Sequence, residues 1–442
     1  MIPLTAQEVA GVCGAETALE ATVTGLAVDS RSVSAGDLFV ALPGERTHGA
    51  RFVEPALAAG AAAALVARDT SLTEPGPINT RVIAVPDPLI ALGQVAAEVR
   101  RRSPATVFGI TGSTGKTSTK DILASLLRRA LPVVASHANY NTEIGLPLTL
   151  GRVEPQTRAV VLELAMRGPG QIAYLAEIGR PQVAVITNIG PVHLEVMGTI
   201  EAVAEAKAEI LQSLRAEDAA VVPYDEPLLA PYLEMCRARV LTFGEHPGAD
   251  VVLTGFAPGR AEFAAGGRTL TVSVNVAQHH NAQNLCAALA ACVAAGLDPG
   301  ELTAGGVQVE ISRWRGEELE LPGGGLLIAD CYNANPTSMD ASLRHLVEVA
   351  GNRPTVAVLG DMAELGETGP AYHDQVGALL RELGVDRVVA VGPLARAYGG
   401  TWYADREAAL RGLAENLRPG DVVLVKGSRS VGLEALVEAL EP

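Results

Sequence analysis

The chain has 442 residues, carries a net charge of −16 and is 48% apolar. Its length predicts about three domains, and its composition is typical of folded, turn-rich proteins rather than of disordered chains. The acidic balance disfavours nucleic acid and anionic membrane surfaces as partners. We therefore expect no nucleic-acid partner, and any phosphate that the chain binds must be held by local groups.

The sequence shows no sign of a membrane span or of a secretory signal. Its longest small-apolar stretches, 56–67 and 286–297, fall short of the roughly 20 residues that a membrane helix needs. The start of the chain lacks the basic and apolar regions of a signal peptide. The five cysteines contain no CxxC pair, which indicates reduced thiols rather than disulfides or a zinc site. These features predict a cytoplasmic protein.

Residues 1–84 predict a small α/β domain. Short β-like runs at 38–42 and 82–85 alternate with alanine-rich stretches that favour helices. Prolines and a predicted helix over 90–102 follow, and this composition favours a domain boundary after residue 84.

Residues 85–312 predict a second domain that is built on a parallel sheet. Near-continuous apolar runs bounded by Pro, Gly or charged residues are typical of strands that are buried on both faces of such a sheet. The predicted strands are 106–110, 159–164 and 183–187, followed by a β-alternating region over 240–277 and a helix over 281–295.

Residues 313–442 predict a third, Rossmann-like domain, because strand-like and helix-like segments alternate along them. The predicted strands are 326–329, 356–359, 388–391 and 422–425, and the predicted helices are 339–349, 373–383 and 433–440. The fold class that we predict is therefore α/β, with a central parallel sheet and a C-terminal Rossmann-like domain.

A glycine-rich segment after the first strand of the second domain predicts a nucleotide triphosphate site. Gly112 and Gly115 let the backbone wrap a phosphate, Lys116 can meet its β- and γ-oxygens, and Thr117 can hold Mg²⁺. The strict phosphate-loop pattern has Gly at position 110, where this chain has Ile110. A glycine-rich turn with a chance Lys-Thr pair is the alternative, which the strand–loop–helix context disfavours. The nucleotide-binding candidates are Thr111, Gly112, Ser113, Thr114, Gly115, Lys116 and Thr117.

Two side chains at predicted strand ends are candidate Mg²⁺ ligands. Glu163 lies in the run 160–164, and His193 follows the strand over 183–187 and the pair Thr187-Asn188. The carboxyl ends of parallel strands meet at one edge of a sheet, so we expect these groups near the phosphate loop. A surface carboxylate and an ordinary loop histidine are the alternatives. No Asn-Lys-x-Asp segment of a GTPase occurs, whereas an ordinary kinase remains open from the loop alone.

Lys207 lies in the middle of the apolar stripe of a helix predicted over 199–215. No acidic residue lies three or four positions from it, so it has no helical ion-pair partner. A bare ammonium on a core face is costly. The lysine therefore reaches the surface with its long side chain, finds a distant carboxylate, or changes its charge chemically.

These motifs together resemble the Mur ligase family, and the resemblance covers nearly the whole chain. It rests on Asp29-Ser-Arg31, 36–42, the phosphate loop, 139–147, the spacing of His193-Leu-Glu195 to Lys207, His280-Asn281 with Asn284, 330–336, 360–366 and 426–430. The segments Tyr-Asn-Ala-Asn-Pro336 and Lys426-Gly-Ser-Arg-Ser are similar to the branch of the family that adds D-alanyl-D-alanine.

The resemblance implies an ATP-dependent ligase that joins D-alanyl-D-alanine to UDP-N-acetylmuramoyl tripeptide, a step of peptidoglycan synthesis. It implies ATP and Mg²⁺ as cofactors, and we expect a monomer. Its three domains would be a UDP-substrate-binding domain over 1–84, an ATP-binding ligase domain over 85–312, and a Rossmann-like domain over 313–442 that binds the dipeptide. In this family the lysine that matches Lys207 is often carbamylated, which would remove the buried cation.

The resemblance also implies roles for individual residues. The catalytic set is Lys116, Glu163, His193, Lys207 and Arg315. The metal ligands are Thr117, Glu163, His193 and Lys207 as a carbamate. Asn281, Asn284, Arg315 and Asp330 join the loop in nucleotide binding. The substrate-binding set is Ser30, Arg31, Asn139, Asn141, Thr142, Tyr332, Asn333, Asn335, Lys426, Ser428 and Arg429.

The chain departs from the family pattern in two places. The segment before Asn139 is Ser136-His-Ala138, where a Gly is common, and Arg313 accompanies Arg315 where one arginine is expected. We favour Arg315 for the ATP site.

Two other functions compete with this prediction. A folylpolyglutamate synthase shares ATP and amine attack, but the N-terminal Asp29-Ser-Arg31 module argues against it. A non-enzymatic nucleotide-dependent binding protein is disfavoured because Lys116, Glu163, His193 and Lys207 are all retained.

Overall fold

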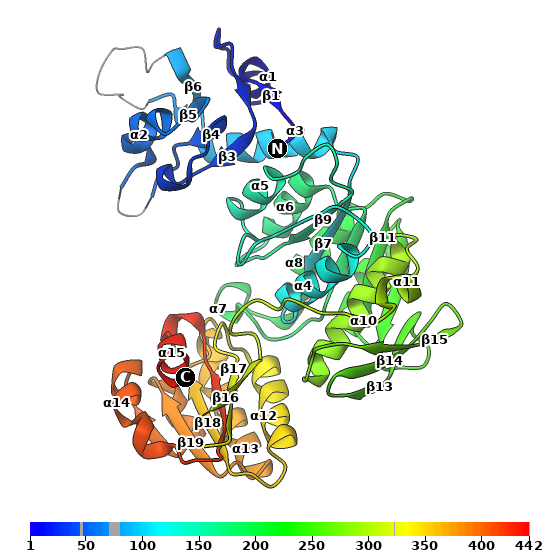
Figure 1. The fold of residues 1–442 in the computed structure, drawn as a ribbon, viewed down its shortest axis with the longest axis vertical. Coiled ribbons are helices and arrows are strands. Elements are labelled where there is room, and N and C mark those ends of the chain that lie inside the picture. The colour runs from blue at the N-terminus through cyan, green and yellow to red at the C-terminus, as the bar shows by residue number, and fades with distance from the viewer. Residues whose placement is uncertain (45–46, 70–79, 322, 442) are drawn as a thin grey trace.

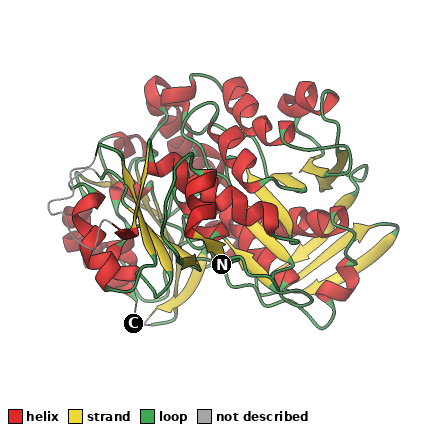
Figure 2. Cartoon of the chain, turned by 90° about the horizontal axis from the view of Figure 1, so that it is seen from above, coloured by secondary structure: helices red, strands yellow, loops and turns green. Residues whose placement is uncertain are grey.

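The computed structural model describes residues 1–44, 47–69, 80–321 and 323–441. They form three sheet-based units that follow one another along the longest axis of the molecule in chain order (Figure 1). Helices pack against the sheets in each unit (Figure 2). Within the described ranges, no helix has the length and apolar character needed to cross a membrane.

The N-terminal unit contains a four-stranded parallel sheet in the order β3-β4-β5-β6 and a small antiparallel pair, β1-β2. The predicted strands at 38–42 and 82–85 are confirmed. An alanine-rich stretch also forms a strand, because Ala63 and Ala64 are fully buried between neighbouring strands. The elements are β1 (Leu4–Thr5), α1 (Ala6–Val12), β2 (Thr22–Val23), β3 (Gly25–Ala27), β4 (Asp37–Val40), α2 (Val53–Ala58), β5 (Ala63–Ala67) and β6 (Val82–Val85).

The central unit contains a nine-stranded sheet in the order β15-β14-β13-β12-β11-β10-β7-β9-β8. The strands from β8 to β13 are parallel, as predicted, and β14 and β15 extend the sheet in antiparallel fashion. The strands are β7 (Thr106–Thr111), β8 (Val133–Ala135), β9 (Ala159–Glu163), β10 (Val183–Ile186), β11 (Ala219–Pro223), β12 (Arg239–Gly244), β13 (Val251–Ala257), β14 (Arg260–Ala265) and β15 (Arg268–Ser273).

Helices cover both faces of this sheet, which explains its continuous apolar strands. Helices α4 and α10 share a core with one face, and α3, α6 and α8 share a core with the other. Helix α3 also packs against α1 and thus joins the first two units. The helices are α3 (Pro88–Arg102), α4 (Lys116–Leu127), α5 (Gly145–Leu150), α6 (Gln171–Gly179), α7 (Leu194–Met197), α8 (Ile200–Gln212), α9 (Ala230–Glu234), α10 (His279–Ala294) and α11 (Pro299–Thr303).

The C-terminal unit contains a six-stranded sheet in the order β16-β17-β21-β18-β19-β20, in which only β16 is antiparallel. All seven predicted elements are present, and β16, β20 and α14 are additional. The elements are β16 (Glu317–Leu321), β17 (Gly325–Ala329), α12 (Pro336–Ala350), β18 (Thr355–Gly360), α13 (Gly369–Glu382), β19 (Arg387–Val391), β20 (Thr401–Tyr403), α14 (Arg406–Asn416), β21 (Val422–Lys426) and α15 (Glu434–Leu440).

The cysteines are free thiols. Cys13, Cys286, Cys292 and Cys331 are buried, whereas Cys236 is partly exposed. Burial raises the pKa of each of the four buried thiols to about 12.

Candidate functional site

The predicted phosphate loop connects β7 to α4 at the carboxyl edge of the central sheet. Gly112 and Gly115 adopt φ values of 144° and 75°, which side-chain-bearing residues rarely adopt. Lys116 begins α4, and its ammonium donates hydrogen bonds to the carbonyls of Gly112 (2.7 Å) and Ser113 (3.2 Å). The loop therefore curls around its own lysine, next to the free N–H groups of a helix N-terminus.

The segment after β10 braces this loop. Asn188 accepts a hydrogen bond from the Thr114 amide (2.9 Å), and the Ser113 hydroxyl bonds to Gly190. The Thr187 hydroxyl donates to the Thr114 carbonyl (2.5 Å). The pair Thr187-Asn188, which the sequence placed near the ligands, thus holds the loop in shape.

Glu163 ends β9, the strand next to β7, and is buried. Its carboxylate accepts hydrogen bonds from the Thr117 hydroxyl (2.9 Å) and from the Asn141 amide (2.8 Å). The structure thus brings the predicted metal ligands Thr117 and Glu163 together with the predicted substrate residue Asn141. Asn139 and Thr142, on the same segment, are exposed.

Ala138, which precedes this segment, has a φ of 47°. The left-handed region suits glycine, so Ala138 is a position of the segment 136–138 at which a glycine would fit the backbone.

Lys207 is 98% buried on α8, and no acidic partner is found for it among the described residues. Burial, together with repulsion from Lys116, holds its pKa well below the ordinary range. Lys207 therefore lies within electrostatic range of the phosphate-loop lysine, and both burial and that repulsion favour the neutral form of its amine.

Arg315 reaches the same loop from the third unit. Burial lowers the pKa of Lys116 to about 8, Glu163 opposes that shift, and Arg315 adds to it through repulsion. The Arg315 guanidinium stacks 4.0 Å from the Tyr332 ring, and its buried Nε has no hydrogen-bond partner. Arg313 instead pairs with Glu441 at 2.7 Å and is 58% exposed.

Asn281 and Asn284 lie on α10 beside the loop. The Asn284 amide oxygen accepts from Thr119 of α4 (3.3 Å) and packs against the Cα of Gly115, so a side chain at 115 would collide with it. Asn281 bonds to Asn284 (3.1 Å) and to Gln278 (2.7 Å). Gln278 then donates to the Gly316 carbonyl (2.6 Å). Gln278, which the sequence did not indicate, thus links Asn281 and Asn284 to the third unit through hydrogen bonds.

Asp330 and Lys426 form an ion pair (2.6 Å) at the carboxyl ends of β17 and β21. The buried Lys426 ammonium also donates to the Asn333 carbonyl (3.2 Å), and Ser342 donates to Asp330 (2.6 Å). His280 of α10 faces this pair, and burial lowers its pKa to about 4. Asp330 therefore lies where the second and third units meet.

The other predicted substrate residues of the third unit have structural contacts. Asn335 caps α12 through the Ser338 amide (2.9 Å), and the Ser428 hydroxyl accepts from the Ala363 amide (2.8 Å). Arg429 pairs with Glu434 (3.3 Å), and its guanidinium lies 5.7 Å from the Tyr332 ring.

Ser30 and Arg31 lie in the N-terminal unit, in a short helical turn that Asp29 caps. Arg31 hydrogen bonds to Asp29, which lowers the pKa of that carboxyl to about 2. The Arg31 side chain is 89% exposed, so its guanidinium is available at the surface of this unit.

His193 follows β10 and bonds through Nδ1 to Glu364 of the third unit (2.5 Å) rather than to Glu163 or Lys207. Four non-glycine residues with positive φ in the described ranges form two pairs: His193 contacts Glu364, and Ala138 and Trp314 line one cavity. Arg180 is the fifth such residue in these ranges. Such conformations are typical of functional sites.

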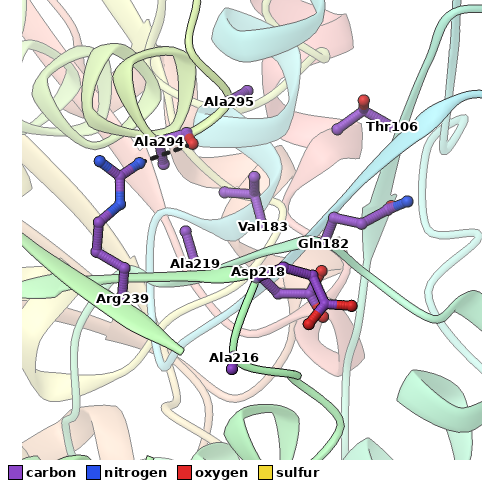
Figure 3. Close-up of a pocket in the computed structure, with 10 residues that line it drawn as sticks. Thr106, Gln182, Val183, Ala216, Asp218, Ala219, Arg239, Ala294 and Ala295 are labelled. Atoms are coloured by element: carbon purple, nitrogen blue, oxygen red, sulfur yellow. Dashed lines mark hydrogen bonds between the residues drawn. The ribbon is translucent and has the colours of Figure 1, made fainter. Parts of the chain in front are cut away.

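A cavity of about 470 Å³ extends from Thr117 along α4 to Arg315 and Tyr332. Arg128 and Arg152 also line it, so it offers positive charge within an acidic protein. A second cavity of about 400 Å³ opens at the opposite end of β7, beside Thr106 (Figure 3). Its lining holds none of the predicted site residues, whereas Thr117, Arg315 and Tyr332 line the first cavity.

Three family models match the chain in order. Residues 22–100 match the Mur ligase family, catalytic domain; residues 110–292 match the Mur ligase middle domain; and residues 314–429 match the Mur ligase, glutamate ligase domain.

Individual relatives match over almost the full length. The UDP-N-acetylmuramoyl-tripeptide--D-alanyl-D-alanine ligase of Bacillus subtilis is 34% identical, with 95% of this chain and 94% of the relative covered. A crystal structure of MurF from Acinetobacter baumannii superposes with a TM-score of 0.89 at 31% identity, covering 100% and 99% of the two chains. MurF ligase from Thermotoga maritima, solved with ADP, gives 0.82 at 32% identity, covering 95% and 97%.

Proposed function

Because this chain belongs to the Mur ligase family, we propose that it is an ATP-dependent ligase that joins D-alanyl-D-alanine to UDP-N-acetylmuramoyl tripeptide. The reaction forms the pentapeptide precursor of peptidoglycan and releases ADP and phosphate. One observation carries the proposal: Thr117 of the phosphate loop and Arg315 of the third unit line the same cavity, and the Glu163 carboxylate lies 2.9 Å from the Thr117 hydroxyl. Such a convergence of groups from two units suits phosphoryl transfer.

The three units have separate tasks in this proposal. Residues 1–84 bind the UDP end of the substrate, where Arg31 offers an exposed cation. Residues 85–312 bind ATP on the phosphate loop. Residues 313–442 complete the nucleotide site through Arg315 and Asp330 and receive the dipeptide. The dipeptide and the tripeptide therefore meet where the second and third units join.

Making an amide requires an activated carboxylate, because a free carboxylate is a poor electrophile. The terminal carboxylate of the tripeptide attacks the γ-phosphorus of ATP, and ADP leaves. The amine of D-alanyl-D-alanine then attacks the carbonyl carbon of the acyl phosphate, loses a proton, and expels phosphate. Lys116 and Arg315 stabilise the charge on the transferred group, and the loop amides hold the nucleotide in place.

The residues at the site fit Mg²⁺. Thr117 and Glu163 present neighbouring oxygens, and oxygen is the ligand that Mg²⁺ prefers. Mg²⁺ usually takes one or two protein carboxylates together with waters and substrate phosphates, so one further anionic side chain beside Glu163 would suit this site. When bound, the ion neutralises charge on the transferred phosphoryl group.

Lys207 supplies that ligand as a carbamate. A neutral amine attacks CO₂, forms a C–N bond and loses a proton, and this leaves an anionic oxygen pair. Burial and repulsion from Lys116 lower the pKa of Lys207, which favours the neutral amine, the form that reacts. With His193, the proposed ligand set is Thr117, Glu163, His193 and carbamylated Lys207.

A substrate screen tests the proposed function. We expect phosphate release from ATP only when UDP-N-acetylmuramoyl tripeptide and D-alanyl-D-alanine are both present, because one supplies the carboxylate and the other the amine. Tripeptides ending in diaminopimelate and in lysine should both be tried. Turnover with a folate and glutamate, and none with the proposed pair, would overturn the assignment.

A further inference from the structure

A loop of the third unit touches the histidine of the central unit directly. Glu364 Oε2 lies 2.5 Å from His193 Nδ1, and the Glu364 carbonyl accepts from the Glu195 amide at 3.1 Å. Gly366 on the same loop packs against the Glu195 backbone so closely that a side chain there would lie 3.0 Å from its Cα. The contact is thus made by main chain and side chain together.

Both partners of this contact have unusual backbones. His193 has a φ of 54° and Glu364 a φ of 64°, and neither is a glycine. A left-handed conformation at such residues persists only when the surrounding structure enforces it. The strain on both sides of one hydrogen bond indicates that the two side chains are held in position.

The Glu364 loop is held by the core of the third unit. Ser428 accepts from the Ala363 amide (2.8 Å) and donates its own amide to the Asp361 carbonyl (3.0 Å). The Met362 amide donates to buried His373 (3.0 Å). The Glu364 carboxylate is therefore fixed to the core of the third unit, and its position relative to His193 depends on how that unit docks.

The chemistry of the pair decides which nitrogen of His193 is free. A glutamate carboxylate has no hydrogen to donate, so across the 2.5 Å contact Glu364 accepts and His193 Nδ1 donates. In the neutral ring, Nδ1 must then carry the hydrogen, which leaves the lone pair on Nε2. A carboxylate on the far nitrogen is also the usual way in which proteins orient a metal-binding histidine.

We propose that Glu364 is a positioning residue of the active site, which sets the Nδ1–H tautomer of His193 and frees Nε2 when the third unit docks. The inference rests on the proposed function and deepens it, because the histidine becomes a competent ligand only in the docked arrangement. Docking of the third unit then brings Arg315 and Asp330 to the site and also orients His193 of the central unit.

The test compares Glu364→Gln, Glu364→Gly and the control Glu367→Gln in the full chain labelled with ¹⁵N-histidine. Glu367 is exposed on the same loop, so its variant removes an equal charge without touching His193. Glu364→Gly keeps the left-handed backbone and removes only the side chain. Two-bond ¹H–¹⁵N spectra, taken without nucleotide or substrate, report the tautomer, and His193→Asn identifies the signal.

We expect a single Nδ1–H tautomer in the unaltered protein and in Glu367→Gln, and a tautomer mixture in both Glu364 variants. The Mg²⁺ concentration for half-maximal phosphate release should rise about 10- to 100-fold in the Glu364 variants alone. Small-angle scattering of Glu364→Gln should be unchanged, because the main-chain contact to Glu195 remains. An unaltered tautomer in both Glu364 variants, or an equal Mg²⁺ effect in Glu367→Gln, would overturn the proposal. Inactivity of the unaltered protein with the proposed substrates would count against the function only, since the spectra need no turnover.

Discussion

The hydroxyl of Thr117 lies 2.9 Å from the carboxylate of Glu163, although 46 residues separate them along the chain. The sheet brings them together, because Thr117 follows β7 and Glu163 ends the neighbouring β9. Two oxygens at the edge of a parallel sheet, next to a phosphate loop, form the core of the proposed metal site.

Replacing Glu163 by Gln should weaken the binding of Mg²⁺ at this site. The amide keeps the size of the side chain but removes its charge, so we expect the Mg²⁺ concentration for half-maximal turnover to rise about tenfold or more. A Mg²⁺ titration of phosphate release measures this effect. The exposed Glu177→Gln variant on α6 is the charge-matched control, and an equal response of both variants would contradict the assignment.

Gly115→Ala should damage nucleotide binding more than backbone strain alone explains. A Cβ at 115 would collide with the Asn284 amide, and the residue has a φ of 75°. Gly170 also precedes a helix with a φ of 81° but has open space around it. Gly170→Ala should therefore cost about 1 kcal/mol of stability, the strain term alone. Urea unfolding measures the stability of each variant, and the KM for ATP measures its nucleotide binding. Similar stability losses and similar KM values for Gly115→Ala and Gly170→Ala would contradict the predicted clash.

The pH dependence of ATP use should report Lys116. Burial lowers its pKa to about 8, so the ammonium is charged below that pH and neutral above it. We expect kcat/KM for ATP to fall about tenfold per pH unit above pH 8, since this ratio reports the free enzyme. A Lys116→Arg variant stays charged and should lack this fall, however low its activity.

A rise in pH has the opposite effect on the contribution of Lys116 to the stability of the fold. Its pKa is lower in the folded state than in the unfolded chain (about 10.4), so between these values the unfolded chain binds the extra proton. The Lys116 contribution to the free energy of unfolding therefore rises with pH across this window.

Lys207→Ala should abolish turnover, because the carbamate is a proposed ligand. Acetate should restore part of the activity by supplying a carboxylate in the vacated space, whereas Lys207→Arg should remain inactive as a permanent cation. ¹³C-bicarbonate should give the native protein a carbamate signal that Lys207→Ala lacks. Full activity of Lys207→Ala, or an active enzyme with an unmodified lysine, would remove the hypothesis.

Arg315→Ala and Arg313→Ala should differ sharply. Arg315 has a buried Nε with no protein partner and acts on Lys116, whereas Arg313 pairs with Glu441 at the surface. We expect a loss of about 100-fold in kcat/KM for ATP at 315 and less than threefold at 313. The reverse order would assign the nucleotide arginine to position 313.

The sequence indicated those parts of the site that have a local pattern. The glycines and lysine of the loop lie between a strand and a helix, and Lys207 stands out against an apolar helix face. Buried strands were recognisable from their apolar runs. In each case neighbouring residues carry the signal, so the folded structure matches the prediction closely.

Contacts between units have no such local signal. Glu364 and Gln278 reach partners in another unit, and no periodicity marks them. The strand β5 was hidden because alanine favours helices, and only its burial in the sheet overrides that preference. Asn335 and Ser428 show the converse: the sequence motif is present, but their side chains are occupied by a helix cap and a loop.

The thiol pattern makes this protein suited to spectroscopic labelling. Four cysteines are buried with raised pKa values, so maleimides and methanethiosulfonates should react at Cys236 alone. Cys236 follows α9 in the central unit, and one cysteine introduced on the exposed face of α13 would complete a probe pair. Distances between two such labels would follow the third unit directly as it approaches the phosphate loop, without removal of any native cysteine.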